Sequence, residues 1–150
     1  MTEISDLTVH TGYWLRMVSN TVSQEFARKV ATEGVTVAEW TFLRALYDAD
    51  AMAPSALADR MGMSRGAISK LADRLVDKAL VSRSDHAEDG RMQALSLTAA
   101  GRDKVPALAA LADRNDAEYF GVLSDDERAA LDRLLRTLAD RRGLKTVPVD

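Results

Sequence analysis

The sequence contains no cysteine and is poor in glycine, proline and aromatic residues. Without cysteine the chain has no disulfide, no thiolate zinc site and no cysteine redox switch, which fits a reducing cytoplasm. No apolar run approaches the roughly 20 residues of a membrane-spanning helix. The acidic first ten residues lack the features of a secretion signal. With 47% hydrophobic residues over 150 positions, the chain is expected to fold as one domain, and we expect it in the cytoplasm.

The net charge of −3 argues against a uniformly basic nucleic-acid-binding protein. Between Arg60 and Arg91, however, seven Lys and Arg residues stand against five Asp and Glu residues. This segment therefore carries +2 and the remainder of the chain −5. A small basic region on an acidic body permits contact with DNA but does not by itself indicate it.

Apolar residues recur every three or four positions over most of the chain, which indicates amphipathic helices. The first helix is expected over residues 10–31. The second opens at Thr36, because Glu39 three residues later completes the spacing of a capping box. Ser124 and Glu127 repeat this spacing and open the last helix. The fold class is therefore mainly α.

Two shorter helices occupy the middle of the chain. Pro54 suits the first position of one helix, where its missing N–H costs nothing, and Gly62 ends that helix. Ser64 is a natural N-cap for the next helix, which runs to about Lys78.

The apolar period then changes from helical to alternating. Residues 80–84 and 94–98 are predicted to be short strands, and the polar segment 85–91 between them is predicted to be a loop with an Asp-Gly turn. Thr98 can cap a further helix after the second strand. The result is a small β-hairpin wing beside a helix-turn-helix.

The helix after Ser64 has the chemistry to read DNA. Its free N–H groups and positive dipole end can bind phosphate, and the small residues Gly66 and Ala67 permit close approach. Arg65 can donate two hydrogen bonds to guanine. The expected DNA-contacting residues are Ser64, Arg65, Gly66, Ala67, Ser69, Lys70 and Arg74 on this helix, with Asp89 and Arg91 on the hairpin.

In the hairpin, Arg91 can enter the minor groove, where negative potential is concentrated, and Asp89 can orient it. Taken singly, each of these charges fits an ordinary solvated surface better. Their combination with a hairpin favours DNA binding.

The stretch SALADRMGMSRGAISKLADRLVDKALVSRSDHAEDGRMQALSLTAAGR resembles the MarR (multiple antibiotic resistance regulator) family. The resemblance extends over about residues 10–142. It rests on the apolar spacing, on LVSR at the first strand, on the motif from Asp89 to Arg91, and on LSLTAAGR after the second strand.

The resemblance implies a transcriptional regulator, which we expect to act as a homodimeric repressor on pseudo-palindromic double-stranded DNA. It implies one domain over residues 1–150. Residues 36–98 would form the winged helix-turn-helix lobe, and residues 10–34 and 99–143 would form dimerisation helices. It further implies major-groove contact by the helix after Ser64 and minor-groove contact by Arg91.

The sequence departs from the family pattern at two positions. Ala79 stands where members usually have glycine, and a left-handed backbone there would cost on the order of 1 kcal/mol. Ala53 precedes Pro54 where a hydroxyl cap is usual. Both departures affect stability rather than a DNA contact.

Many family members release DNA when a small aromatic or anionic molecule binds between the dimerisation helices and the DNA-binding lobe. The expected wall of such a site in this chain comes from the first two helices. Its candidate residues are His10, Tyr13, Trp14, Arg16, Met17 and Trp40. The alternative, that these aromatic side chains form plain dimer core, is favoured by their helical spacing.

Two other classes of function compete with gene control. An enzyme is disfavoured because neither histidine has a convincing partner and no phosphate-binding glycine motif or nucleophile–base pair is present. The cluster around His86 lacks metal-ligand spacing, and no cofactor is expected. A winged helix used only for protein–protein contact is the alternative.

Overall fold

The protein's structure, a computed structural model, describes residues 2–86 and 89–147, with the side chains of residues 85–92 excepted. A 3-10 turn, Leu7–Val9, precedes a chain of helices interrupted once by a hairpin. The elements are α1 (Thr11–Ala31), α2 (Val37–Tyr47), α3 (Pro54–Met61), α4 (Arg65–Asp77), β1 (Val81–His86), β2 (Asp89–Leu97), α5 (Ala99–Phe120) and α6 (Asp125–Arg141).

Side-chain caps begin the helices where the sequence predicted them. At α2, Thr36 N donates to Glu39 Oε1 at 2.8 Å and Glu39 N donates to Thr36 Oγ1 at 3.1 Å, which is a complete capping box. Ser124 and Glu127 form the second box at α6. At α3 the N-cap residue makes no side-chain bond, and Pro54 occupies the first turn.

The strands are longer than predicted: residues 85, 86 and 89–91 of the predicted loop belong to β1 and β2, so the prediction is wrong there, and residues 87 and 88 lie outside the described residues. Strand β1 pairs with β2 in antiparallel register from Val81 with Leu97 to Asp85 with Gln93, and an irregularity follows before His86. The prediction relied on apolar alternation, which ends where the hairpin leaves the core. Backbone hydrogen bonding needs only an extended partner strand, so the ladder continues into the polar segment.

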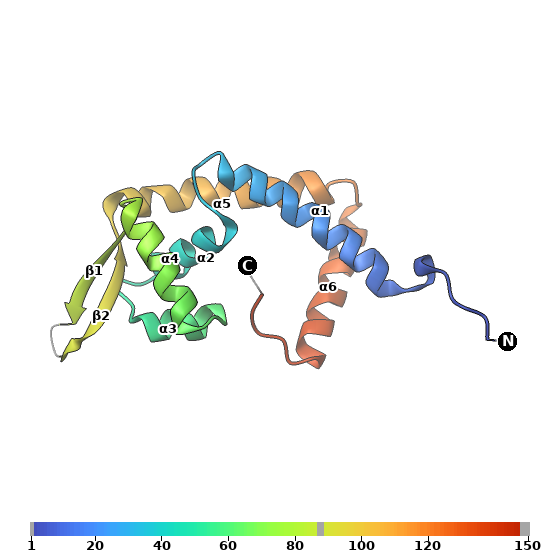
Figure 1. Ribbon diagram of the computed structural model, residues 1–150. Coiled ribbons are helices and arrows are strands. Elements are labelled where there is room, and N and C mark those ends of the chain that lie inside the picture. Colours follow the sequence, from blue (N-terminus) through green and yellow to red (C-terminus); the bar gives the residue numbers. More distant parts are fainter. Residues whose placement is uncertain (1, 87–88, 148–150) are drawn as a thin grey trace.

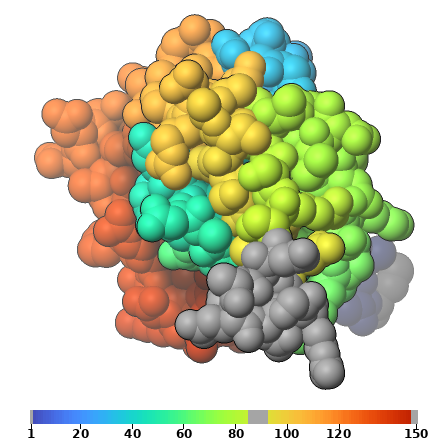
Figure 2. Space-filling model, turned by 90° about the vertical axis from the view of Figure 1, so that its left-hand side faces the viewer, coloured from blue at the N-terminus to red at the C-terminus, as the bar shows by residue number. Residues whose placement is uncertain are grey.

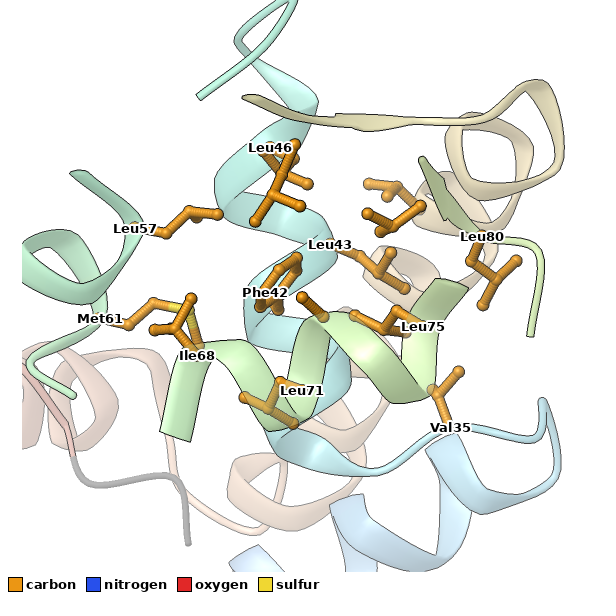
Figure 3. Close-up of a cluster of buried hydrophobic side chains, with 14 of the residues drawn as sticks. Val35, Phe42, Leu43, Leu46, Leu57, Met61, Ile68, Leu71, Leu75 and Leu80 are labelled. Carbon is orange, nitrogen blue, oxygen red and sulfur yellow. The ribbon is translucent and has the colours of Figure 1, made fainter. Parts of the chain in front are cut away.

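The core lies between α2, α3 and α4, and the hairpin base and α5 close it. Phe42, Leu57, Ile68 and Leu75 are fully buried, and they come together from all three of these helices (Figure 3). On α2, Trp40 and Tyr47 are only partly buried and pack against the edge of this core.

Helices α1 and α5 form a separate layer along one side of this lobe, and α6 descends from the far end of α5 (Figure 1). Polar contacts join α1 to α5: Asn115 Nδ2 donates to Val22 O at 3.2 Å, and Lys29 Nζ donates to Asn115 Oδ1 at 2.9 Å. Asn115 is 4% exposed. In the part of the chain that the structure describes, no helix is both long and apolar enough to cross a membrane.

The turn between α4 and β1 contains the one non-glycine residue with a left-handed backbone in the described chain, Ala79 (φ 60°). Ala79 O accepts a hydrogen bond from Thr98 Oγ1 at 2.7 Å. This bond joins the end of α4 to the start of α5, so it fixes the base of the hairpin that lies between them. A Cβ on Gly101 would collide with the carbonyl of Leu80 in the same corner. The sequence therefore keeps glycine where space is lacking and tolerates alanine where only the φ angle is unfavourable.

We predict that Ala79→Gly raises the free energy of unfolding by about 1 kcal/mol, because glycine adopts this φ without the penalty of a Cβ. Urea denaturation measures the change. The matched control is Ala27→Gly on the exposed face of α1, which should lower stability by a similar amount. If both variants change the free energy of unfolding in the same direction, the left-handed backbone of Ala79 is not a source of instability.

Candidate nucleic-acid interface

The first turn of α4 is open to solvent and begins with a capped end. Ser64 Oγ accepts from Ala67 N at 3.1 Å, so this hydroxyl serves as the helix cap. The N–H groups of Arg65 and Gly66 belong to the helix's first turn and have no intrahelical acceptor. A Cβ added to Gly66 would meet nothing closer than Ser64 Oγ at 4.0 Å. The protein fold itself therefore does not require glycine at this position.

One face of α4 is buried and the opposite face is open. Ile68 and Leu75 pack into the core, whereas Arg65, Ser69 and Lys70 are exposed. Among the described residues, neither Arg65 nor Lys70 forms an ion pair with another side chain. These two cations are thus available to an external anion.

The C-terminal half of α4 is held to α2 by a buried carboxylate. Glu39 is fully buried, and Lys78 Nζ lies 2.9 Å from each of its two oxygens. Lys78 Nζ also donates to Gly34 O at 2.8 Å. Arg74 Nη2 lies 3.5 Å from Glu39 Oε1, and its side chain is 51% exposed. Arg74, a predicted DNA contact, therefore has one internal partner and one open side.

The surroundings of Glu39 keep it ionised. Burial raises the pKa of this carboxyl, but the hydrogen bond from Lys78, the backbone N–H of Thr36 and the positive charge of Lys78 together outweigh burial. The net result is a pKa below the ordinary value of 4.5. Glu39 Oε2 nevertheless has no hydrogen-bond donor in suitable geometry among the described residues. The contact between α2 and α4 thus depends on the negative charge of Glu39 and the positive charges of Lys78 and Arg74.

The hairpin is attached to α4 by a second ion pair. Arg83 Nη2 on β1 donates to Asp73 Oδ1 on α4 at 2.5 Å. Ser82 and Ser96 bridge the two strands at 3.1 Å. Because Asp73 lies on the exposed side of α4, the pair sets the hairpin's position relative to the helix face. Figure 2 shows this side of the molecule, with α4 (lime green) beside the strand residues.

The predicted hairpin contacts Asp89 and Arg91 lie in β2, but their side chains are outside the described residues. The N-terminal end of α4 and the far end of the hairpin strands lie on the same, lower side of the molecule in Figure 1. The structure therefore brings the two predicted DNA-contacting elements to a shared side.

The predicted ligand-binding residues lie at two separate places in the chain. Trp14 lines a cavity of about 590 Å³ with apolar residues of α1, α5 and α6. Trp40 lines a smaller cavity of about 250 Å³ between α1, α2 and α5, with Phe26 and Asn115. It also borders a cavity of about 300 Å³ between α2 and α3. The other four candidates lie on the exposed N-terminal half of α1 or directly before it, with Tyr13 partly buried; they are His10, Tyr13, Arg16 and Met17.

Sequence reasoning missed the residues that hold the interface in place. Glu39 was predicted only as part of a capping box, and Lys78, Asp73 and Arg83 were given no role. The four-residue spacing of Arg74 and Lys78 put both cations on one side of the helix. It did not show that the carboxylate of Glu39, 39 residues before Lys78, would meet both of them.

Comparison with known proteins agrees with this geometry. The profile of the MarR family matches residues 33–92. A Thauera aromatica protein, described as a candidate transcriptional regulatory protein for the hcr operon, is 31% identical over 128 residues, which cover 85% of this chain and 77% of that protein. The HTH-type transcriptional repressor MdtR of Bacillus subtilis is 29% identical over 113 residues, 75% of this chain and 73% of MdtR.

Solved structures share the fold. The apo crystal structure of wild-type MarR from E. coli has a TM-score of 0.74 at 25% identity, covering 91% of this chain and 98% of MarR. A cysteine-to-serine mutant of MarR, crystallised with operator DNA, has a TM-score of 0.77 at 23% identity, covering 91% and 99% of the two chains. The family match and the names of these relatives define the class of protein as a winged helix-turn-helix transcriptional regulator. The chain belongs to the MarR family.

We predict that Glu39→Gln lowers the free energy of unfolding at neutral pH by about 2 kcal/mol, because it removes a buried, charge-assisted contact. The folded-state pKa of Glu39 lies below its unfolded value, so its stabilising contribution is complete above about pH 4.5 and is lost as the pH falls through the folded-state pKa. Stability measured from neutral to acidic pH should therefore fall less steeply in Glu39→Gln than in the wild type.

Glu127→Gln is the matched control, since Glu127 forms the same capping box on α6 but is exposed and has no lysine partner among the described residues. Glu127→Gln should change the fall in stability between neutral and acidic pH much less than Glu39→Gln does. If the two variants show the same pH dependence, the pair between Glu39 and Lys78 contributes nothing beyond helix capping.

Proposed function

We propose that the protein is a homodimeric repressor that binds a pseudo-palindromic operator and blocks transcription sterically. The observation that carries this proposal is the open N-terminal turn of α4, with exposed Arg65 and Lys70, on the same side of the molecule as the hairpin. A helix in the major groove and a hairpin arginine in the adjacent minor groove use such an arrangement. Asp89 would orient Arg91 at the hairpin.

Exposed apolar surface supports a homodimer. Trp14, Leu15 and Val18 on α1 are 50%, 48% and 38% exposed, and Leu134 and Leu138 on α6 are 57% and 53% exposed. The three α1 residues line the apolar cavity of about 590 Å³, to which α6 also contributes. An apolar surface of this kind is costly in water, and a second copy's helices would cover it. The proposed dimerisation helices are residues 10–34 and 99–143.

Two copies related by a two-fold axis would present two α4 helices to DNA. Half-sites about 34 Å apart, one helical turn, match such a pair. The repressor role is consistent with MdtR, which is named a repressor. A protein–protein module on the same fold is the alternative, and it would show no salt-dependent affinity for duplex DNA.

An effector site is part of this proposal. The cavity beside Trp40 lies between α1 and α5 on one side and α2 on the other, so a molecule in it touches both layers of the protein. Trp40 directly follows Glu39, which holds the C-terminal half of α4. A flat aromatic acid seated against Trp40 would therefore shift the support of the DNA-facing helix, and Asn115 offers it a buried polar partner.

We predict that a phenolic acid quenches tryptophan fluorescence and releases DNA at the same concentrations. Trp14→Phe should retain the quenching, because that residue lies in the other cavity, and Trp40→Phe should lose it. Fluorescence titration and a DNA-release assay on each variant make the measurement. No quenching and no release across a panel of phenolic acids would refute the effector site.

The DNA-binding proposal is tested by selecting bound fragments from a random duplex library and then assaying variants on the selected sequence. Arg65→Ala should cost about 1–3 kcal/mol of binding and relax base preference at one position per half-site. Gly66→Ala should leave stability unchanged or raised by up to about 1 kcal/mol, because the fold has room for the Cβ. It should still weaken DNA binding where the backbone approaches phosphate.

The opposite responses of stability and affinity in Gly66→Ala separate an interface effect from a folding defect. Arg91→Ala should weaken binding and lower the salt slope without changing base preference at the Arg65 position. If all three variants bind the selected duplex as the wild type does, the interface is assigned to the wrong face. If no duplex is selected, or the protein sediments as a monomer, the proposed function fails.

A further inference from the structure

The C-terminal end of the chain carries a cluster of cations that the proposed interface does not use. From residue 133 to residue 145 there are five basic side chains and one acidic side chain, Asp140. All five are exposed, and among the described residues none forms an ion pair. They are Arg133, Arg136, Arg141, Arg142 and Lys145.

The path of the chain after α6 is set by backbone hydrogen bonds. Gly143 has a left-handed φ of 66°, Leu144 N donates to Ala139 O at 2.8 Å, and Gly143 N donates to Asp140 O at 3.2 Å. This pair of bonds is the Schellman arrangement, which ends a helix and reverses the chain. The tail is therefore turned back toward the lobe that contains α3 and α4 (Figure 1).

The returning tail reaches the turn of the helix-turn-helix. A Cβ built on Gly62 would lie 2.5 Å from Thr146 Oγ1 and 3.1 Å from Thr146 Cβ. Gly62 is two residues before Ser64, the N-cap of the DNA-facing helix. Lys145 precedes Thr146 directly, and Arg142 is the C-cap of α6. The C-terminal end of α6 lies on the same lower side of the molecule as α3 (Figure 1).

We propose that Arg142 and Lys145 form an additional phosphate-binding site that contacts the DNA backbone beside the first turn of α4. The inference rests on the proposed function, since it needs DNA on that face. DNA phosphates flank a base-reading helix on both sides, and exposed cations at such a place bind them without reading sequence. Arg141 lies within the last turn of α6 rather than after it, and is left out of the site.

This site explains how an acidic protein gains affinity for DNA. The helix and hairpin segment from Arg60 to Arg91 carries only +2, and three of its cations, Arg74, Lys78 and Arg83, are paired internally. Arg142 and Lys145 add two charges per chain at the end of α6 and in the tail that reaches the Gly62 turn. In a dimer they add four, which equals the number that Arg65 and Lys70 supply.

The test is the double variant Arg142→Gln/Lys145→Gln, assayed against the selected duplex and against a duplex of random sequence. Affinity should fall about tenfold on both at moderate salt, and the slope of log affinity against log salt should become shallower by about 2 to 4, since each lost phosphate contact accounts for roughly 0.9. Base preference, measured by selection, should not change. Arg142→Lys alone should bind as the wild type does.

The matched control is Arg28→Gln/Arg114→Gln, which removes the same charge from exposed positions on α1 and α5. Because Arg28, Arg114 and Arg142 lie within the proposed dimerisation helices, sedimentation must first show that each variant is still a dimer. The salt slope of the control should stay near the wild-type value. The inference is overturned if the Arg142 and Lys145 variant keeps wild-type affinity and slope, or if the control lowers the slope equally, which would make the effect one of net charge. A wild type that binds neither duplex overturns the proposed function itself.

Discussion

A single buried carboxylate connects the parts of this protein that must keep a fixed relation to one another. Glu39 caps its own helix through Thr36 and holds Lys78 and Arg74 at the end of α4. Burial of a charge is tolerated only where partners compensate it, and here two cations and a backbone N–H do so. The orientation of α4 therefore depends on an electrostatic contact in addition to the apolar packing of the core.

The two ends of α4 are held differently, and this difference matters for binding. Its C-terminal half is fixed by Glu39 and by the pair between Arg83 and Asp73, which also positions the hairpin. Its N-terminal turn has the Ser64 cap and, among the described residues, no ion pair at Arg65. A rigid base with an open tip suits an element that must enter a groove, because groups already in place lose little freedom on binding. The surface that α1 and α6 expose is apolar instead, so the molecule separates a face suited to phosphate from a face suited to another protein surface.

The sequence by itself determined which segments form helices and strands and where most of them begin. Helix caps and the spacing of apolar residues involve positions only three or four residues apart. Thr36 with Glu39, Ser124 with Glu127, and Ser64 each mark a helix start that the structure confirms. The left-handed turn after α4 was also foreseeable, since a glycine is usual there. Local hydrogen bonds and local steric limits depend on neighbouring residues, so the order of residues along the chain is sufficient to predict them.

Only the tertiary structure decided the contacts between distant residues. The meeting of Glu39 with Lys78 and of Thr146 with the Gly62 turn joins positions 39 and 84 residues apart. The extension of the hairpin past its apolar part and the placement of the two tryptophans in separate cavities could not be predicted either. Such contacts depend on the path of the whole backbone, which no local pattern of residue types contains.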